Sequence, residues 1–362
     1  MKKNFNFFGT KKIFFAAALA LAFAVGCGSV YAEKPLSIKK QGFFASGGTV
    51  TALLPGEYDY KINWLSATRE GNSAHVDHAS TFYQIPAKEK ASPVVFLHGY
   101  GQSRTGWVTT PDGRGGWSTL ALRNGRAVFL VDQPRTGEAG SSVKMTAGFP
   151  DVKADDPFAY LPGDQAWYTH FRIGRIAPER YEGSRFPEGE EAQNQFFRQM
   201  TPNTGSYDEK LFGGSLSAVL SDVSKMTGKK AVYVTHSRGG RVGWQTDAEN
   251  MAALVAIEPG GTPLVGSEEY KKFLDAKIPM LVVFGDYIGE RGPEEIKSSE
   301  FWKNVRDQAL DFAEHYRADG GEAEVWDLPA MGITGNSHFM FQEKNNVQIW
   351  ELIEKWLKAH KV

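Results

Sequence analysis

One serine of this chain stands in a sequence context that is typical of a nucleophile. The apolar run 231–234 leads directly into Thr-His-Ser-Arg-Gly at positions 235–239. A buried strand that turns sharply into a helix exposes the serine hydroxyl, and small residues are needed two positions before and after it. Thr235 stands where glycine is usual. The pattern predicts that Ser237 is a nucleophile. The alternative is a tight strand–helix turn with an unreactive serine.

A serine nucleophile needs a base, and histidine is the usual base near neutral pH. Of the eight histidines, His338 alone follows the last predicted strand and precedes the last predicted helix, in Gly-Asn-Ser-His at 335–338. The order serine, acid, histidine along the chain is one of the established orders of a catalytic triad. We therefore predict His338 as the base, against the alternative of a surface histidine at a loop tip.

Two carboxylates are candidates for the acid that orients the histidine. Glu258 directly follows the apolar run 254–257, at the carboxyl end of a predicted strand, where the sites of α/β proteins form. An unpaired buried carboxylate there would be costly. Asp286 lies just beyond the run 280–284. In the common arrangement of such a triad, the acid comes about three residues after the glycine that ends this strand, and Ile288 occupies that position here. Glu258 is the favoured acid, and Asp286 is the alternative.

The loop after the first buried strand has the composition of an oxyanion-binding loop. Leu-His-Gly-Tyr-Gly-Gln at 97–102 closes the apolar run that begins at residue 93. Backbone N–H groups aimed at a developing negative charge are typically worth roughly 10²–10³ in turnover each. We predict the amides of Tyr100 and of Arg238, the residue after the serine, as the two donors. A glycine-rich turn without chemical function is the alternative.

Other kinds of chemistry find little support in the sequence. His75 and His78 are three residues apart in a strand-like segment, and no cysteine or further histidine cluster completes a metal site. Arg-Gly-Gly-Trp at 114–117 lacks the Lys-Ser/Thr ending of a phosphate loop. With 41 basic and 42 acidic residues, the net charge is -1, without the basic excess of a nucleic-acid binder. We predict no metal, no cofactor and no nucleic-acid partner.

The elements that must position these residues alternate between strands and helices. Continuous apolar runs, the mark of strands buried on both faces, occur at 93–97, 127–131, 231–234, 254–257 and 280–284, with a last strand near 324–328. Helix-like segments lie at 216–226, 300–316 and 347–357. The alternation predicts an α/β fold with a mostly parallel central sheet and helices on both faces.

Two further segments extend this core. Residues 33–90 have a β-rich pattern, with short strands at 42–44 and 47–50 separated by a turn, and an alternating strand at 80–85 that a proline ends. Residues from about 141 to 212 show no β/α alternation and are rich in aromatic residues, proline and glycine. Because so long a structureless loop is unusual in a compact domain, we interpret 141–212 as a lid inserted over the carboxyl edge of the sheet. A separate small domain is the alternative.

The first 32 residues have the pattern of an export signal. Four lysines precede an apolar run at 13–25 that has the length of a signal h-region and is too short to span a membrane, and Val-Tyr-Ala at 30–32 offers a cleavage point. Cleavage there leaves a net charge of -5 and no cysteine. We expect a periplasmic or secreted protein. Gly26-Cys27 loosely resembles a lipoprotein box, so a lipid on Cys27 is one alternative, and an N-terminal anchor helix is another.

From residue 91 to the end, the chain resembles the α/β-hydrolase superfamily, and more narrowly a group of secreted bacterial and fungal serine esterases. The shared features span nearly all of the mature chain. They are Phe-Phe-Ala-Ser-Gly-Gly at 43–48, Phe-Tyr-Gln-Ile-Pro at 82–86, Thr-Pro-Asp-Gly-Arg at 110–114, Gly-Trp at 116–117, Val-Asp-Gln-Pro at 131–134, Thr-His-Ser at 235–237, Glu-Pro-Gly-Gly at 258–261 and Gly-Asn-x-His at 335–338. In that group a glutamate after the sixth strand completes the triad, which implies Glu258. Tyr100 stands where a glycine is common.

The residues and the resemblance together predict an exported hydrolase of small-molecule carboxylic esters that acts through an acyl-enzyme. Residues 91–362 would form its catalytic domain, in which Ser237 attacks, His338 transfers the proton and Glu258 supports the imidazolium. A thioesterase, amidase or peptidase on the same fold is the alternative among enzymes. An inactive extracytoplasmic binding protein is the alternative from another class.

Overall fold

The computed structural model describes residues 35–52, 54–61, 70–140 and 163–362. The predicted leader with Cys27 and the first part of the predicted lid, 141–162, lie outside the described residues. The chain divides into two units, Met1–Ser37 and Ile38–Val362. All the elements below belong to the second unit.

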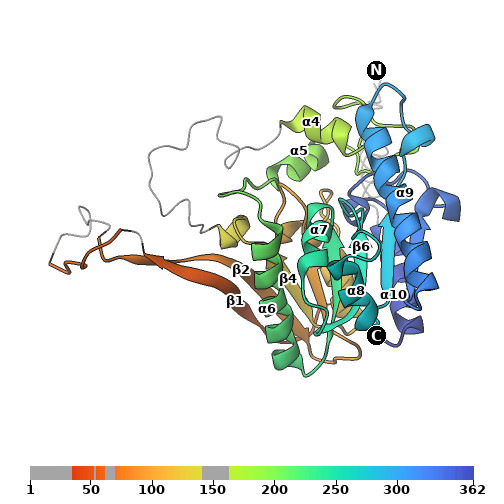
Figure 1. Ribbon diagram of the computed structural model, residues 1–362. Coiled ribbons are helices and arrows are strands. Elements are labelled where there is room, and N and C mark those ends of the chain that lie inside the picture. Colours follow the sequence, from red (N-terminus) through yellow and green to blue (C-terminus); the bar gives the residue numbers. More distant parts are fainter. Residues whose placement is uncertain (1–34, 53, 62–69, 141–162) are drawn as a thin grey trace, which may run out of the picture. The chain divides into compact units, whose positions relative to one another are not determined.

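The described residues form one eight-stranded sheet (Figure 1). Its strands are β1 (Ile38–Ala52), β2 (Ser73–Pro86), β3 (Val94–Leu97), β4 (Val128–Asp132), β5 (Ala231–His236), β6 (Met251–Ile257), β7 (Met280–Phe284) and β8 (Ala323–Asp327). They lie in the order β1-β2-β4-β3-β5-β6-β7-β8. β2 is antiparallel to β1 and β4, and the strands from β4 to β8 are parallel. The predicted α/β fold with a mostly parallel sheet is confirmed.

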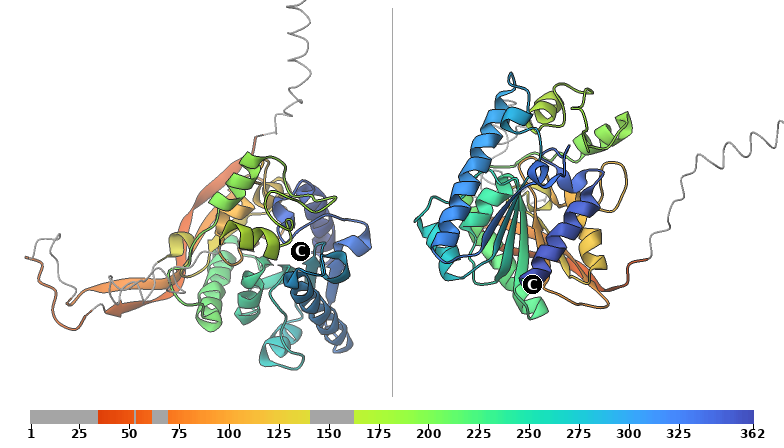
Figure 2. Two further views of the ribbon diagram at one scale, coloured as in Figure 1. Left: turned by 90° about the horizontal axis from the view of Figure 1, so that it is seen from above. Right: turned by 90° about the vertical axis from the view of Figure 1, so that its right-hand side faces the viewer.

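Helices cover both faces of the sheet, as the right-hand view of Figure 2 shows. α2 (Trp117–Arg123) and α10 (Asn346–Ala359) lie on one face, where the rings of Trp117 and Trp350 are 5.5 Å apart. The other face carries α6 (Glu209–Thr227), α7 (Arg238–Gln245), α8 (Glu268–Asp275) and α9 (Lys297–Ala318). α4 (Asp164–His170) and α5 (Glu190–Arg198) lie together beyond the carboxyl ends of the parallel strands (Figure 1).

Several short elements complete the second unit. Single turns of 3₁₀ helix are found at Arg104–Trp107, Gly137–Ala139, Gly289–Arg291, Leu328–Met331 and Met340–Gln342. Among the described residues, no helix is both long and apolar enough to cross a membrane.

The predicted turn between two short N-terminal strands is wrong. β1 is continuous, and the residues on both sides of Gly48 pair with His78 and Val76 of β2. Gly48 lies opposite Asp77, and both have a left-handed backbone, with φ of 78° and 59°. The glycines therefore kink the strand without ending it, because the long partner strand holds the chain on either side.

α6 begins earlier than the sequence pattern predicts. Asp208 caps its N-terminus by accepting a hydrogen bond from the amide of Leu211, so the helix starts at Glu209. Gly213 lies inside this helix. A Cβ at that position would be 2.6 Å from the Cβ of Gln245 in α7, so glycine allows the two helices to pack closely. The glycine is thus a point of close helix packing and not a helix boundary.

Candidate active site

Ser237 lies at a strained turn between β5 and α7. Its backbone has φ 55° and ψ -124°, a conformation that a residue with a side chain adopts only where its surroundings enforce it. Hydrogen bonds enforce it here, because the Ser237 amide donates to the Ile257 carbonyl and the Ser237 carbonyl accepts from the amides of Gly240 and Gly260. The predicted strand–turn–helix context of this serine is therefore present.

The loop after β3 lies directly against this turn. β3 and β5 are parallel neighbours, so their carboxyl ends meet at the same edge of the sheet. A Cβ on Gly99 would lie 2.8 Å from the Cβ of Ser237 and 2.9 Å from Nδ1 of His236. A Cβ on Gly239 would collide with the carbonyl oxygen of His98. Glycine at both positions is what lets the two backbones touch.

The buried imidazole of His98 holds the loop in this place. Its Nδ1 is 2.7 Å from the Gly99 carbonyl, and its Nε2 accepts a hydrogen bond from the Gln133 amide at 3.2 Å. Such a pattern requires a neutral ring protonated on Nδ1, and burial lowers the pKa of His98 accordingly. The side-chain amide of Gln133 donates in return to the His98 carbonyl. The segment after β4 thus fixes the predicted oxyanion loop.

His338 and Glu258 form a buried hydrogen-bonded pair. His338 lies in the loop between β8 and α10, and its Nδ1 is 3.0 Å from Oε2 of Glu258. The other carboxylate oxygen, Oε1, accepts from the Gly285 amide and from the Arg172 guanidinium, both at 2.6 Å. The Nε2 atom of His338 is buried and has no hydrogen-bond partner among the described residues. It is therefore available to accept a proton.

Asp286, the alternative acid, is bound to backbone groups. Its Oδ2 accepts from the Gly335 amide and its Oδ1 from the Tyr287 amide, both at 2.8 Å. Its own amide donates to the carbonyl of Asn336. These bonds hold the loop that carries His338, whereas the hydrogen bond to the imidazole comes from Glu258. The geometry thus supports Glu258 over Asp286 as the partner of the histidine.

Two residues of this site are not predicted by the sequence. Arg172, on the segment after α4, binds Glu258, which is 86 positions further along the chain. No local sequence pattern predicts such a contact. His236 is expected from the sequence only to flank the serine, but its ring centroid lies 4.5 Å from that of His338. Its Nε2 contacts the His338 carbonyl at 3.0 Å, and its Nδ1 is 2.9 Å from Oε1 of Gln102. Its position at the end of a buried strand, directly before the predicted nucleophile, is the one sequence signal for it.

The protonation of the two imidazoles follows from their surroundings. Burial, with smaller contributions from the charges of Arg172 and His170, lowers the pKa of His338 well below its ordinary value. Burial is also the largest cause of the lowered pKa of His236. Both rings are therefore neutral at pH 7, which is the form in which His338 can act as a base.

Tyr100 and Arg238, whose backbone amides are the two predicted oxyanion donors, are in contact through their side chains. The guanidinium of Arg238 contacts the rings of Tyr100 and Tyr207, 4.5 Å and 4.4 Å from their centroids. Burial lowers the pKa of Arg238 to about 10, so the group stays cationic and attracts both ring faces. Arg238 is also the first residue of α7, where the positive end of the helix dipole favours an anion.

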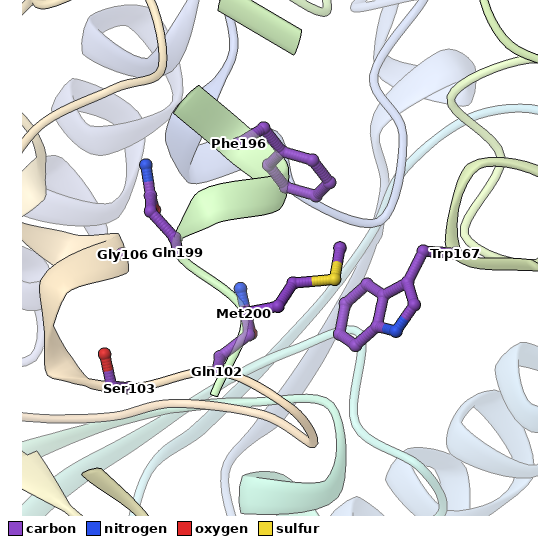
Figure 3. A pocket seen from close by; sticks show the side chains of 7 residues that line it. All are labelled: Gln102, Ser103, Gly106, Trp167, Phe196, Gln199 and Met200. Atoms are coloured by element: carbon purple, nitrogen blue, oxygen red, sulfur yellow. The ribbon is translucent and has the colours of Figure 1, made fainter. Parts of the chain in front are cut away.

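A small pocket lies beside the predicted oxyanion loop (Figure 3). It is lined by Gln102, Ser103, Gly106, Trp167, Phe196, Gln199 and Met200. Trp167 joins it to the site, because its ring stacks both on Tyr100 and on Phe339, the residue after His338. Aromatic residues of the predicted lid therefore serve as core and as pocket wall.

The residue Asp77, between the two histidines considered for a metal site, belongs to an ion pair. Asp77, between His75 and His78, accepts two hydrogen bonds from the guanidinium of Arg135, at 2.7 Å and 3.0 Å. In the part of the chain that the structure describes, no three or more His, Cys, Asp or Glu side chains are grouped so that they could hold a metal ion.

Comparisons with known proteins agree with the fold. No family model matches the chain. It is 29% identical to a bacterial esterase of known structure, with a TM-score of 0.73 and coverage of 91% of this chain and 98% of the esterase. It is 25% identical over 317 residues, 74% of this chain and 81% of the relative, to the protein named "Probable secreted lipase phiG" from a fungal species (strain ATCC 74256). The strand order, the strained serine turn and these similarities show that the chain belongs to the α/β-hydrolase superfamily.

Proposed function

We propose that the protein is a serine hydrolase of carboxylic esters in which Ser237, His338 and Glu258 form the catalytic triad. The chain is a carboxylesterase-like hydrolase, in keeping with the names of its bacterial and fungal relatives. The observation that carries the assignment of the triad is the buried hydrogen bond of 3.0 Å between His338 and Glu258, at the sheet edge where the strained turn presents Ser237.

Each step of the proposed mechanism uses a group described above. The Ser237 oxygen attacks the ester carbonyl while Nε2 of His338 takes its proton. Glu258 keeps the other ring nitrogen protonated and stabilises the imidazolium that forms. The amides of Tyr100 and Arg238 hold the oxyanion of the tetrahedral intermediate. His338 then gives the proton to the departing alcohol, and a water molecule activated in the same way hydrolyses the acyl-enzyme.

The role of Ser237 is tested by covalent labelling and turnover. A fluorophosphonate should form an adduct on Ser237, identified by peptide mass mapping. The Ser237→Ala variant should lose the label and roughly 10⁴–10⁶ of the turnover of a p-nitrophenyl ester, the scale of a lost triad serine. Ser73→Ala, an exposed serine at the start of β2, is the matched control and should behave as wild type. Ester hydrolysis by Ser237→Ala near the wild-type rate would overturn the mechanism.

The substrate class is tested with matched esters, thioesters and anilides that carry the same acyl group. Hydrolysis led by the ester supports the proposal, and a preference for the thioester or anilide makes the protein a thioesterase or amidase. Absence of both labelling and turnover in the wild-type protein would instead indicate a binding protein on a hydrolase fold.

We propose further that the protein is exported. The leader pattern of residues 1–32 supports this, as does the word "secreted" in the name of the fungal relative. Expression in a bacterial host, followed by fractionation and N-terminal sequencing, should yield a mature chain that begins at Glu33. Recovery of a membrane-bound chain that a Cys27→Ser substitution releases would assign it as a lipoprotein instead.

A further inference from the structure

Two consecutive residues after α4 contact both members of the His338–Glu258 pair. Phe171 stacks on the imidazole, with ring centroids 4.7 Å apart and an interplanar angle of 14°, and its carbonyl accepts a hydrogen bond from the His338 amide. The Arg172 side chain is 1% exposed and donates from NH2 to Oε1 of Glu258 at 2.6 Å. This segment, which the sequence suggests only as part of a cover, is built into the centre of the site.

Arg172 is itself held in one geometry. Its Nε donates to the carbonyl of Asp286 at 2.9 Å, and its guanidinium lies 5.3 Å from the ring centroid of Trp302. Its backbone has φ 64°, a left-handed conformation that non-glycine residues keep only under constraint. An arginine that is buried, paired and strained in this way is a rigid part of the structure and not a mobile surface charge.

The contacts divide the oxygens of Glu258 between two tasks. Oε1 is shared by Arg172 and the Gly285 amide, which leaves Oε2 facing the imidazole of His338. Without the guanidinium, one backbone amide would have to fix the rotation of the carboxylate about its last side-chain bond. Triad geometry is sensitive to such freedom, because a displacement of about 1 Å costs on the order of 10²-fold in rate.

The charge of Arg172 acts on His338 as well. The titratable or charged groups that face this imidazole are Glu258, Arg172, His170 and His236. Glu343 accepts a hydrogen bond from the amide of Ser337, the residue before His338. Among them Arg172 is the permanent positive charge, and it offsets the negative charge of Glu258. Its presence therefore favours the neutral imidazole, which lowers the pKa of His338.

We propose that Arg172 is a positioning residue through which the segment after α4 fixes Glu258 against His338. Its effect on turnover rests on the proposed function, since Glu258 matters to the rate only if His338 is the base. Its effect on the titration of His338 does not depend on turnover. The test therefore measures both quantities in the same variants.

The variants separate charge from geometry. Arg172→Gln removes the charge, and Arg172→Lys keeps it but loses the planar fork that bonds Glu258 and Asp286 together. The matched control is Arg175→Gln, in the same segment, whose side chain is 60% exposed in an ion pair with Glu295. Turnover of a p-nitrophenyl ester is followed against pH, and the His338 ring is titrated by NMR of protein labelled with ¹⁵N-histidine.

We expect Arg172→Gln to lower kcat about 10²-fold with little change in KM, and to raise the pKa of His338 by about one unit. The acidic limb of its activity profile then moves to higher pH. Arg172→Lys should lose kcat but keep the wild-type titration, and Arg175→Gln should match wild type in both.

The outcomes distinguish this proposal from the proposed function. The ¹⁵N spectra also show whether Nδ1 of His338 carries the proton that is hydrogen-bonded to Glu258. An Nδ1 signal that matches wild type in both Arg172→Gln and Arg172→Lys overturns the positioning role, whether or not the protein hydrolyses esters. A perturbed Nδ1 signal in the Arg172 variants of a protein that neither labels nor turns over keeps the positioning role and rejects the esterase. Where Arg172→Gln does not fold, Arg172→Lys carries the test, and an unchanged kcat in that variant overturns the proposal.

Discussion

The two acids next to the His338 loop differ in what they bind, and this difference decides what each does. Glu258 reaches the imidazole, whereas Asp286 accepts hydrogen bonds from the amides of Gly335 and Tyr287. One carboxylate therefore acts on the charge and tautomer of His338, and the other on the shape of the loop that carries this histidine.

Conservative amides at the two positions should separate these tasks. Glu258→Gln is expected to lower turnover by about 10⁴-fold, because the ring loses the partner that fixes its tautomer and stabilises its charged form. Asp286→Asn keeps one acceptor oxygen and loses the hydrogen bond to one of the amides of Gly335 and Tyr287, but the imidazole keeps its partner, so turnover should fall far less. Steady-state kinetics of both variants decide the matter, and a larger loss in Asp286→Asn would transfer the role of triad acid to Asp286.

Glu343 is a third buried carboxyl near the base. Its oxygens accept from the amide of Ser337 at 2.8 Å and from the side chain of Asn336 at 2.6 Å. Burial, partly offset by these hydrogen bonds, raises the pKa of Glu343 to about 7. The residue supports the loop, but it is costly to ionise.

This raised pKa predicts a pH dependence of stability. Between pH 4.5 and about 7 the folded chain keeps the Glu343 proton that the unfolded chain has lost, so this group lowers the free energy of unfolding as pH rises. The size of the effect is about 3 kcal/mol at most. Glu343→Gln retains an acceptor and cannot ionise, so urea unfolding should show it gaining stability relative to wild type from pH 5 to pH 8. A difference that stays constant over this range would contradict the assigned pKa.

At the level of elements, the parallel pairing of β3 and β5 brings the Ser237 turn and the predicted oxyanion loop together. Tyr100 in that loop stands where a smaller residue is common, and its ring packs against neighbouring side chains. It stacks on Trp167 and lies 4.5 Å from the Arg238 guanidinium, which also contacts the ring of Tyr207 at 4.4 Å. The stack connects α4, the loop and α7 around the two predicted oxyanion donors.

The contact between the loop and the turn predicts a specific sensitivity at Gly99. The methyl group of Gly99→Ala would lie 2.8 Å from the Cβ of Ser237, so loop and turn must separate and the oxyanion donors shift. We expect a loss of at least about 10²-fold in kcat, comparable to removing one donor. Gly214→Ala in α6, where a Cβ meets no atom within 4 Å, is the control and should leave kcat unchanged. Wild-type kcat in Gly99→Ala would show that this contact is not needed.

For the molecule as a whole, a buried ion pair fastens the C-terminal helix to the sheet. Arg126, just before β4, bonds both carboxylate oxygens of Glu354 in α10, at 2.7 Å and 3.2 Å. The same guanidinium donates to the carbonyls of Ser92 and Val362, so it joins the start of β3 to the end of the chain. Because α10 follows the His338 loop directly, this anchor also limits the position of the base.

Removing one partner of this pair should therefore be costly. Arg126→Met leaves the buried Glu354 with only the exposed Lys358, 3.6 Å away, as a cationic partner, and we expect a loss of about 3 kcal/mol in the free energy of unfolding. Lys303→Met breaks a half-exposed pair with Asp307 in α9 and should cost much less, because water screens that pair. Urea unfolding followed by circular dichroism compares the two, and equal losses would show that burial adds nothing to the Arg126 pair.

The amino-acid sequence determined the features that depend on local patterns. Continuous apolar runs located the parallel strands, since a strand buried on both faces can hold few polar residues. The small residues around Ser237 indicated the sharp turn, because strand and helix approach each other closely only there. The order of Ser237, Glu258 and His338 relative to the strands placed all three at one edge of the sheet.

Only the tertiary structure decided which side chains meet across distant parts of the chain. The choice of Glu258 over Asp286 as the partner of the imidazole depends on carboxylate directions that spacing leaves open. The contact of Arg172 with Glu258 depends on how the segment after α4 folds back over the sheet. Strand and turn propensities are local and can be seen in short windows of sequence. Hydrogen bonds between residues far apart form only where the packed elements bring their atoms within about 3 Å.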